Sequence, residues 1–414
     1  MTSSVHNRRA FLGAVTASAA GGLLAKTAFA SELEGSNALL PATAGEYLFA
    51  DGLTYLNTGT IGPCRRETIE ASMSAWEELE SLPMKFYGIQ GAEALAEKTR
   101  TVAARFLGCD VGEVVITSST TSGMNAIAQG LRLSAGDRIL LSDQEHSGGL
   151  HCWKYFEKYY GAKIDSVAIP RGEFNAAAIL DKFKKAIDKR TKLISVSHVF
   201  SSTGLRMPVA EISALARASG IFCIVDGAQA AGAIKVNVKE LGCHAYATSG
   251  HKWLMGPKGT GLLYISKDAQ AAIRPMQFDE SYNTYNNGNG VVNLPCILGL
   301  AKAIEYLESA GTGKVDEHNL SLRNRLYDKL RNVPNLTILS PPAGPLASPM
   351  LTLLLADKFP RQAFVRTLQD KYKIIIRSTH KEFGFNGIRF SVHIFNTEKE
   401  IDRAADAVRK ELTA

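Results

Sequence analysis

The sequence lacks the features that mark several classes of protein. Its lysines and arginines form no dense stripe with interleaved aromatic residues, which excludes nucleic-acid binding as the main function. No CxxC pair or Cys/His spacing suggests a metal site, and no internal repeat or transmembrane helix is evident. A hydrophobic content of 45% and a charged content of 21% are ordinary for a globular protein. The 414 residues suffice for two or three domains, or for one large and one small domain.

The first thirty residues predict a targeting segment rather than part of the fold. They combine the pair Arg8-Arg9, a weakly apolar Ala/Gly-rich run and the small-x-small motif 28–30. The run ends at Lys26 and is too short to span a membrane. The segment resembles a twin-arginine export signal, so we expect cleavage after Ala30 and a mature protein in a bacterial periplasm or outside the cell. Loss of its three cations lowers the net charge from +7 to +4.

Cysteine is scarce, with six residues in the chain. An exported protein would normally be expected to contain disulfides. Twin-arginine substrates, however, are exported already folded, so we expect this chain to fold in a reducing cytosol and to form no structural disulfide.

Strand and helix patterns alternate between residues 90 and 270. Apolar positions at helical spacing occur in 93–108, 123–133, 148–161, 176–189 and 208–220. Short apolar or β-branched runs occur in 113–119, 137–143, 191–200, 221–228, 245–252 and 259–266. This alternation predicts an α/β fold with a doubly wound, mostly parallel sheet that has helices on both faces.

The pattern changes after about residue 290. Helices are predicted over 292–311, 315–332, 361–372 and 397–412, and strands over 348–356, 373–378 and 387–395. We therefore expect a large domain over 31–300, which includes the N-terminal segment, and a smaller C-terminal α+β domain over 301–414.

Polar side chains follow several of the predicted strands, and ligands of α/β sheets bind beyond the carboxyl ends of strands. These residues are Thr120, Thr121, Glu145, His146, Ser201, Asp226, Gln229, Ser249, His251 and Lys252. Each alone has an ordinary explanation, such as a helix cap for an aspartate or a threonine. Together they suit one ligand that carries a phosphate and a basic ring.

The run "VDGAQAAG" at 225–232, followed by "SGHKWLMGPKGTGLLY" at 249–264, resembles the class V aminotransferases. This family of pyridoxal 5'-phosphate (PLP) enzymes includes cysteine desulfurases and isopenicillin N epimerase-like proteins. The resemblance extends from about Tyr55 to Val408. It implies the type I fold of PLP-dependent transferases, in which a seven-stranded sheet is flanked by helices and followed by a smaller C-terminal domain.

The resemblance also implies roles for individual residues. Lys252, in the family's Ser-x-His-Lys motif, should hold PLP as a Schiff base and then move the Cα proton, whereas Lys258 should be an exposed loop residue. Asp226 should pair with the pyridine nitrogen. His146 should stack on the ring, and Gln229 should bond its phenolic oxygen.

The remaining roles concern the phosphate and the substrate. The phosphate should lie at the helix that follows Thr120 and Thr121. Arg389 should clamp the substrate α-carboxylate, and Asn57 should lie in a segment that folds over the site. The other residues expected to contact the cofactor are Ser201, Ser249 and His251.

The sequence departs from the family in three places. Desulfurases need a cysteine shortly after the segment that matches "IIIRSTH", but this chain has Glu382 near that place and no cysteine after Cys296. Ser201 replaces the usual asparagine, and "SHVFSSTGLRMPV" looks closer to the epimerase-like branch. Gly290-Val291 replaces a Gly-Thr pair whose threonine reaches the neighbouring subunit's phosphate. We still expect a homodimer, and Val291 leaves open whether the neighbouring subunit contacts the phosphate.

We therefore expect a PLP enzyme that acts at the α-carbon of an amino acid or of a peptide- or siderophore-borne amino group. Racemisation and transamination both remain open, and tailoring of an exported peptide or siderophore is the preferred role. One alternative is a cysteine-conjugate C–S lyase. The alternative from another class is a catalytically silent binding protein with a PLP-enzyme fold.

Overall fold

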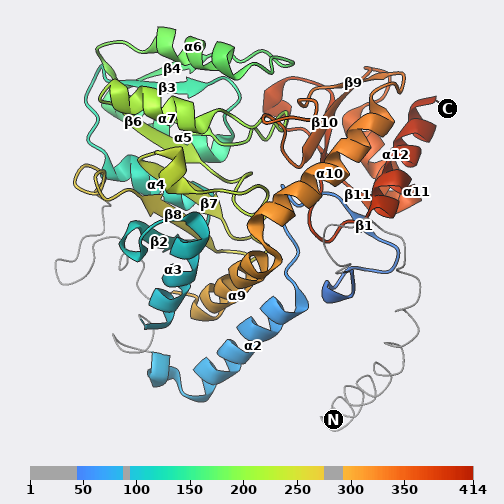
Figure 1. Ribbon diagram of the computed structural model, residues 1–414, viewed down its shortest axis with the longest axis horizontal. Coiled ribbons are helices and arrows are strands. Elements are labelled where there is room, and N and C mark those ends of the chain that lie inside the picture. Colours follow the sequence, from blue (N-terminus) through green and yellow to red (C-terminus); the bar gives the residue numbers. More distant parts are fainter. Residues whose placement is uncertain (1–43, 87–93, 275–291, 414) are drawn as a thin grey trace, which may run out of the picture. The chain divides into compact units, whose positions relative to one another are not determined.

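The computed structural model describes residues 44–86, 94–274 and 292–413 (Figure 1). The predicted signal peptide, the Gly290-Val291 pair and the loop 276–290 lie outside the described residues. The described residues belong to one compact unit. All six cysteine thiols are free.

A seven-stranded sheet forms the larger part of the described chain. Its strands are β2 (Val114–Thr117), β3 (Arg138–Ser142), β4 (Lys163–Val167), β5 (Thr191–Ser197), β6 (Phe222–Asp226), β7 (Ala245–Ser249) and β8 (Gly261–Ile265). The strand order is β2-β8-β7-β6-β5-β3-β4, and only β8 runs antiparallel to its neighbours. The predicted mostly parallel sheet is confirmed. The strand β4 was not predicted, because its sequence KIDSV has two charged residues and little apolar character.

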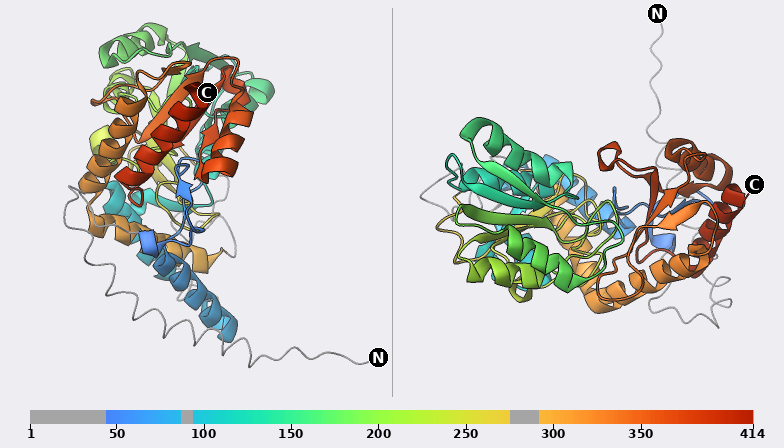
Figure 2. Two further views of the ribbon diagram at one scale, coloured as in Figure 1. Left: turned by 90° about the vertical axis from the view of Figure 1, so that its right-hand side faces the viewer. Right: turned by 90° about the horizontal axis from the view of Figure 1, so that it is seen from above.

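Helices cover both faces of this sheet because side chains alternate along each strand (Figure 2). On β3, Ile139 and Leu141 join one apolar cluster with side chains of α4 (Thr120–Gly130) and α5 (Ser147–Tyr160). Leu140 joins the opposite cluster with side chains of α6 and α7. The remaining helices here are α3 (Ala94–Leu107), α6 (Ala176–Ala186), α7 (Val209–Ala218) and α8 (Val238–Leu241).

The C-terminal residues build a smaller α+β domain, as predicted. Its antiparallel sheet has the order β12-β13-β10-β9, with bounds Arg377–Ser378, Gly387–Ser391, Met350–Leu355 and Leu336–Ile338. The helices are α9 (Leu294–Ala310), α10 (Thr312–Leu330), α11 (Arg361–Tyr372) and α12 (Glu398–Thr413). The helix α9 continues through residue 300, and a domain boundary there stays a prediction. The predicted strand 373–378 is two short strands in different sheets, β11 (Ile374–Ile375) and β12.

The N-terminal segment connects the two sheets at the place where the site forms. Strand β1 (Thr54–Tyr55) pairs in parallel with β11. Farther along, the Gly62 N–H donates to the His251 carbonyl at 2.7 Å. A Cβ at Gly62 would overlap the carbonyl oxygen of Lys252, so only glycine allows this approach. The chain then enters α2 (Arg66–Ser81), an unpredicted helix that packs along α9 (Figure 1).

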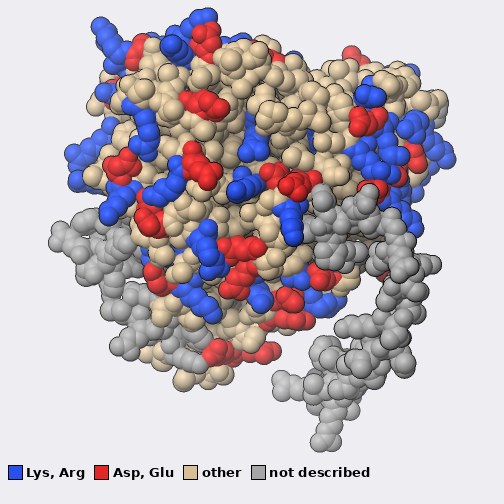
Figure 3. Space-filling view, in the orientation of Figure 1, with Lys and Arg blue, Asp and Glu red and all other residues tan. Residues whose placement is uncertain are grey.

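Two surface properties agree with the composition. On the face drawn in Figure 3, lysines and arginines are interspersed with acidic side chains. Within the described ranges, no helix combines the length and apolar character needed to cross a membrane.

The close approach at Gly62 can be tested by substitution. Gly62→Ala should lower the free energy of unfolding by about 1–3 kcal/mol, because the added methyl group forces the segment away from Lys252. Urea denaturation of the purified protein measures this. Gly112→Ala is the matched control, since a Cβ there has nothing within 4 Å, and it should change stability by less than about 0.5 kcal/mol. Equal free energies of unfolding for the two variants would contradict the close approach of Gly62 to Lys252.

Candidate active site

A cavity of about 290 Å³ lies at the carboxyl ends of β6 and β7, where the C-terminal domain meets the large sheet. Its lining contains these residues predicted from the sequence: Thr120, Thr121, His146, Asp226, Gln229, Ser249, His251, Lys252 and Arg389. It also contains residues for which no role was predicted: Gly59, Thr60, Ser119, Gly148, Ala228, Arg377 and His380. The cavity therefore brings together residues from widely separated parts of the sequence, from Gly59 to Arg389.

One end of the cavity is built to receive an anion. The helix α4 begins here, and its N-cap is Ser119, whose side chain accepts from the Ser122 N–H. Thr120 and Thr121 are therefore not caps, which removes the structural explanation for this pair. The Thr120 hydroxyl lies 2.8 Å from the Ser249 hydroxyl, and both residues line the cavity. Hydroxyls at an 11-residue helix N-terminus favour a phosphate.

Lys252 lies in the turn that follows β7. Burial lowers the pKa of its amine to about 8, and nearby Asp226 partly opposes that shift. No described residue forms a hydrogen bond with Nζ, which leaves the amine open to a ligand. The turn also holds buried Met255 at φ 54, a left-handed conformation that non-glycine residues adopt at a cost. Lys258 is exposed, as predicted, and donates to the Gly62 carbonyl at 2.9 Å.

Asp226 ends β6 and is buried. Burial raises the pKa of its carboxyl, while the Ala228 N–H, at 2.9 Å from Oδ1, and the Lys252 charge act in the opposite direction. A Cβ at Gly149 would lie 2.6 Å from Oδ2, so the start of α5 closes this side of the carboxylate. The other side opens into the cavity.

A second carboxyl, Glu145, lies behind Asp226. The Ser142 hydroxyl donates to Oε1, and the Ser197 N–H and hydroxyl donate to Oε2 at 2.8 and 2.6 Å. Burial raises the pKa of Glu145 to about 7, and the Asp226 charge adds to this shift. Glu145 was noted at a strand end in the sequence but does not line the cavity.

Two imidazoles line the cavity next to each other. His146 caps α5, with Nδ1 accepting from the Gly148 N–H at 3.0 Å, and burial lowers the pKa of its ring to about 3. The His380 ring lies edge-on to His146 with ring centroids 5.0 Å apart. Its Nδ1 lies 3.3 Å from Nη2 of Arg377, and its Nε2 is buried without a hydrogen-bond partner among the described residues. Burial and then the Arg377 charge lower the pKa of His380.

Two guanidinium groups meet at the C-terminal side. Arg377 and Arg389 are direct partners in the β12–β13 register, and both donate to the Thr60 hydroxyl, at 3.3 and 3.1 Å. Nη1 of Arg389 donates to the Ser201 carbonyl at 3.0 Å, and its buried Nε has no partner. Neither arginine forms an ion pair with an acidic side chain in the described chain.

Two residues predicted from the sequence lie outside the lining, and a third is partly occupied by protein partners. Ser201 does not line the cavity, and its contact is the carbonyl that supports Arg389. Asn57 is also outside the lining, where its Oδ1 accepts from the Thr60 hydroxyl at 2.7 Å. Gln229 lines the cavity, but its amide already donates to the Gly59 carbonyl and accepts from the Trp253 indole. One amide hydrogen of Gln229 is left for a ligand.

Comparisons with known proteins agree with this geometry. The family model described as aminotransferase class V matches residues 55–404. The chain is 29% identical to isopenicillin N epimerase from Streptomyces clavuligerus, over 88% of this chain and 96% of that protein. It is 27% identical to cysteine desulfurase from Enterobacter sp. strain 638, over 86% of this chain and 93% of that protein.

The fold also matches that of solved structures. One is a C-DES variant with glycine covalently linked to its PLP cofactor, at a TM-score of 0.79 and 23% identity over 89% of this chain and 99% of that chain. The likeness shows that the chain has the fold of type I PLP enzymes.

The residues of the cavity fit PLP. Thr120, Thr121 and Ser249 suit the phosphate, and Asp226 suits a protonated pyridine nitrogen. The unpartnered amine of Lys252 suits the aldehyde. The orphaned Nε of Arg389 then remains for a further ligand beside the cofactor.

The pKa of Lys252 predicts its reactivity in cofactor-free protein. Acetylation by acetic anhydride, followed by peptide mass spectrometry, should reach half its maximal rate at Lys252 near pH 8, because only the neutral amine reacts. For the exposed lysines as a class, the pH of half-maximal acetylation rate should lie close to the reference pKa of about 10.4. Asp226→Asn should move the Lys252 midpoint to lower pH, since the Asp226 charge raises that pKa.

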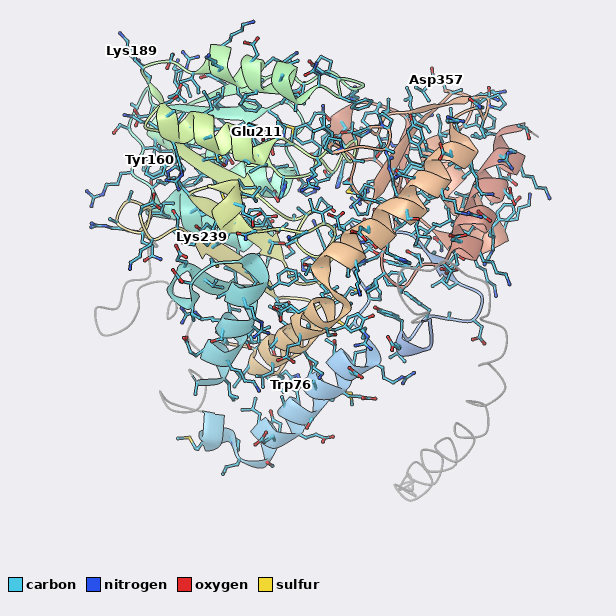
Figure 4. All side chains as sticks on the ribbon, viewed as in Figure 1. Trp76, Tyr160, Lys189, Glu211, Lys239 and Asp357 are labelled. Atoms are coloured by element: carbon cyan, nitrogen blue, oxygen red, sulfur yellow. The ribbon has the colours of Figure 1, made fainter. Side chains whose placement is uncertain are left out.

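Asp357→Asn is the control for this experiment. Asp357 is exposed on the C-terminal domain and does not line the cavity, so its loss should leave the midpoint unchanged (Figure 4). A midpoint for Lys252 near that of the exposed lysines would contradict the burial of its amine.

Proposed function

Because the chain belongs to the aminotransferase class V family, we propose that it is a PLP-dependent epimerase or racemase. It would act at the α-carbon of an amino acid, or of a residue carried by a peptide or siderophore. The observation that carries the proposal is that two proton-transferring side chains, Lys252 and His380, line one cavity and approach it from different domains. Inversion at a carbon needs a group that removes a proton and another that returns one.

PLP, when bound, withdraws electrons from the α-carbon and so makes its hydrogen acidic. The chain's own residues manage the protons. With the cofactor bound, the buried Asp226 carboxylate would hold a proton at the pyridine nitrogen. Lys252, with a pKa of about 8, exchanges a proton between Nζ and the α-carbon at neutral pH.

The substrate carboxylate binds to Arg389 and Arg377. The printed contacts of their guanidinium groups are to Thr60, His380 and the Ser201 carbonyl and include no acidic side chain of the described residues. Planar guanidinium groups bind carboxylates in a bidentate manner. The Thr60 hydroxyl, which both arginines contact, fixes their relative position. This arrangement orients the α-carbon between the proton-carrying groups.

His380 is the second proton-transferring group. Its pKa is lowered partly by the Arg377 charge, which a bound carboxylate would offset. Substrate binding therefore raises the pKa of His380 toward the range in which an imidazole transfers protons at neutral pH. This role goes beyond the desulfurase pattern, because the same loop carries Glu382 where desulfurases need a cysteine.

Loss of one proton-transferring group should affect inversion of the α-carbon more than exchange of its hydrogen with solvent. His380→Gln, assayed in D₂O with L-amino acids and amino-terminal peptides, should lose inversion at least 100-fold while deuterium uptake at the α-carbon falls less than about tenfold. Chiral chromatography and mass spectrometry measure the two quantities. Lys381→Gln, at the neighbouring exposed residue, is the control and should change neither.

The products also distinguish the other functions considered. A keto acid formed in step with loss of the amino group would replace the proposal with amino transfer. Pyruvate released from cysteine conjugates would replace it with C–S cleavage. A purified protein with no absorbance from bound PLP would support a non-catalytic binding protein.

We also propose that the protein acts after export. The support is the twin-arginine pattern at Arg8-Arg9 and the cleavage motif that ends at Ala30. A periplasmic location suits tailoring of an exported peptide or siderophore. In cell fractions, the wild type should appear in the periplasm without residues 1–30, and the variant with both arginines changed to lysine should stay in the cytoplasm at full length.

We further propose that two copies pair through α2. This helix packs on α9 with one side. Its other side and the turn that follows it expose four large apolar side chains. These are Met73, Trp76, Leu82 and Met84, with exposed fractions of 57%, 43%, 55% and 69%. Exposed apolar patches of this kind mark interaction surfaces.

Sedimentation velocity tests the pairing. Trp76→Glu should convert a dimer into a monomer, because it places a charge in the apolar contact. Tyr160→Glu, which changes an exposed aromatic residue on α5, should leave the dimer intact (Figure 4). A wild type that is monomeric at micromolar concentration would refute the proposal.

A further inference from the structure

A second cavity, of about 650 Å³, lies between the large domain and the loop that connects β9 to β10. It shares no lining residue with the candidate active site. The starts of α6 and α7 reach it, and Glu211 of α7, labelled in Figure 4, is part of its wall. Much of the wall is apolar, formed by Phe174, Met207, Pro341, Pro342, Pro345 and Leu346.

A buried histidine presents a hydrogen-bond donor to this cavity. His198 is 2% exposed, and its Nδ1 lies 3.1 Å from the Tyr246 hydroxyl. Tyr246 is fully buried, and among the described residues its hydroxyl has no other hydrogen-bond acceptor, so the hydroxyl donates to Nδ1. Burial lowers the pKa of His198 to about 3, so the ring is neutral and Nε2 carries the hydrogen. No described residue accepts from Nε2.

Two further kinds of donor line the same cavity. Arg206 is only weakly paired, with 4.0 Å between its Nη1 and Oδ2 of Asp316. The ten-residue helix α7 has no side-chain cap, and within the described chain the N–H groups of Ala210 and Glu211 have no acceptor. A neutral imidazole N–H, a guanidinium group and an uncapped helix N-terminus all favour an anion.

We propose that this cavity is a binding site for a small monocarboxylate with an apolar body, such as a short aliphatic acid. The head group would accept from His198, Arg206 and the start of α7, and the body would lie against the proline-rich wall. Glu211, the one acid in the lining, is exposed and disfavours a second negative charge on the ligand. This favours a monocarboxylate over a phosphate or a dicarboxylate.

Isothermal titration of the PLP-loaded protein tests the site, with sodium hexanoate and hexan-1-ol as probes. Hexanoate should bind at least tenfold more tightly than the alcohol. Arg206→Gln should weaken hexanoate binding at least tenfold, and Arg206→Lys should weaken it less, because lysine keeps the charge but loses the planar fork. Lys235→Gln is the matched control. It removes a charge from an exposed residue outside the lining and should leave binding unchanged.

The catalytic arginines also attract carboxylates, so a second variant separates the two sites. Arg389→Gln should leave hexanoate binding within about twofold of the wild type, because Arg389 does not line this cavity. Loss of binding in Arg389→Gln but not in Arg206→Gln would assign the carboxylate to the active site and overturn the proposal. Equal affinities for hexanoate and hexan-1-ol would also overturn the proposal, because the cavity would then bind the apolar body without recognising the carboxylate. Thermal unfolding of each variant checks that Arg206→Gln folds, and Arg206→Lys carries the test if it does not.

Discussion

The candidate site depends on one buried pair of opposite charges, Asp226 and Lys252, at the ends of the neighbouring strands β6 and β7. Burial raises the pKa of the acid and lowers that of the amine, and each charge partly offsets the cost of burying the other. A buried pair without further partners is a poor source of stability. The apolar clusters on both faces of the sheet must therefore hold the strands in place. A cofactor with a basic nitrogen and an aldehyde would give Asp226 a cationic partner and would give the Lys252 amine a bonding partner.

The same reasoning applies to the two arginines. Arg377 and Arg389 are direct cross-strand partners, and like charges at such positions destabilise a sheet. Burial and the Arg377 charge lower the pKa of Arg389 to about 9, which reflects that cost. The Thr60 hydroxyl and the Ser201 carbonyl satisfy some of the guanidinium hydrogens but carry no negative charge. A carboxylate ligand is what would make this arrangement favourable.

The sequence predicted the residues that follow the central strands, because Asp226 and Lys252 belong to one short, specific motif. It did not predict Thr60, Arg377 or His380. These residues reach the cavity only through the pairing of β1 with β11, which joins segments about 320 residues apart, and through the pairing of β12 with β13. The run "IIIRSTH", which matches a family segment and contains Arg377 and His380, is the sequence signal for two of them. The helix α2 was also missed, because its many charged residues and exposed apolar side chains give no clear buried stripe.

The loop over residues 198–206 explains why the acid and the carboxylate-binding arginine keep a fixed separation. At one end, the His198 N–H donates to the Asp226 carbonyl at 2.8 Å, and three residues later the Ser201 carbonyl accepts from Arg389. A single rigid stretch of the large domain thus holds both groups, although Arg389 belongs to the C-terminal domain. The Ser348 hydroxyl, which donates to the Gly204 carbonyl at 2.6 Å, ties that domain to the same loop. Relative motion of the two domains would have to break these buried hydrogen bonds together, so the distance from Asp226 to Arg389 is set by the loop and not by a hinge.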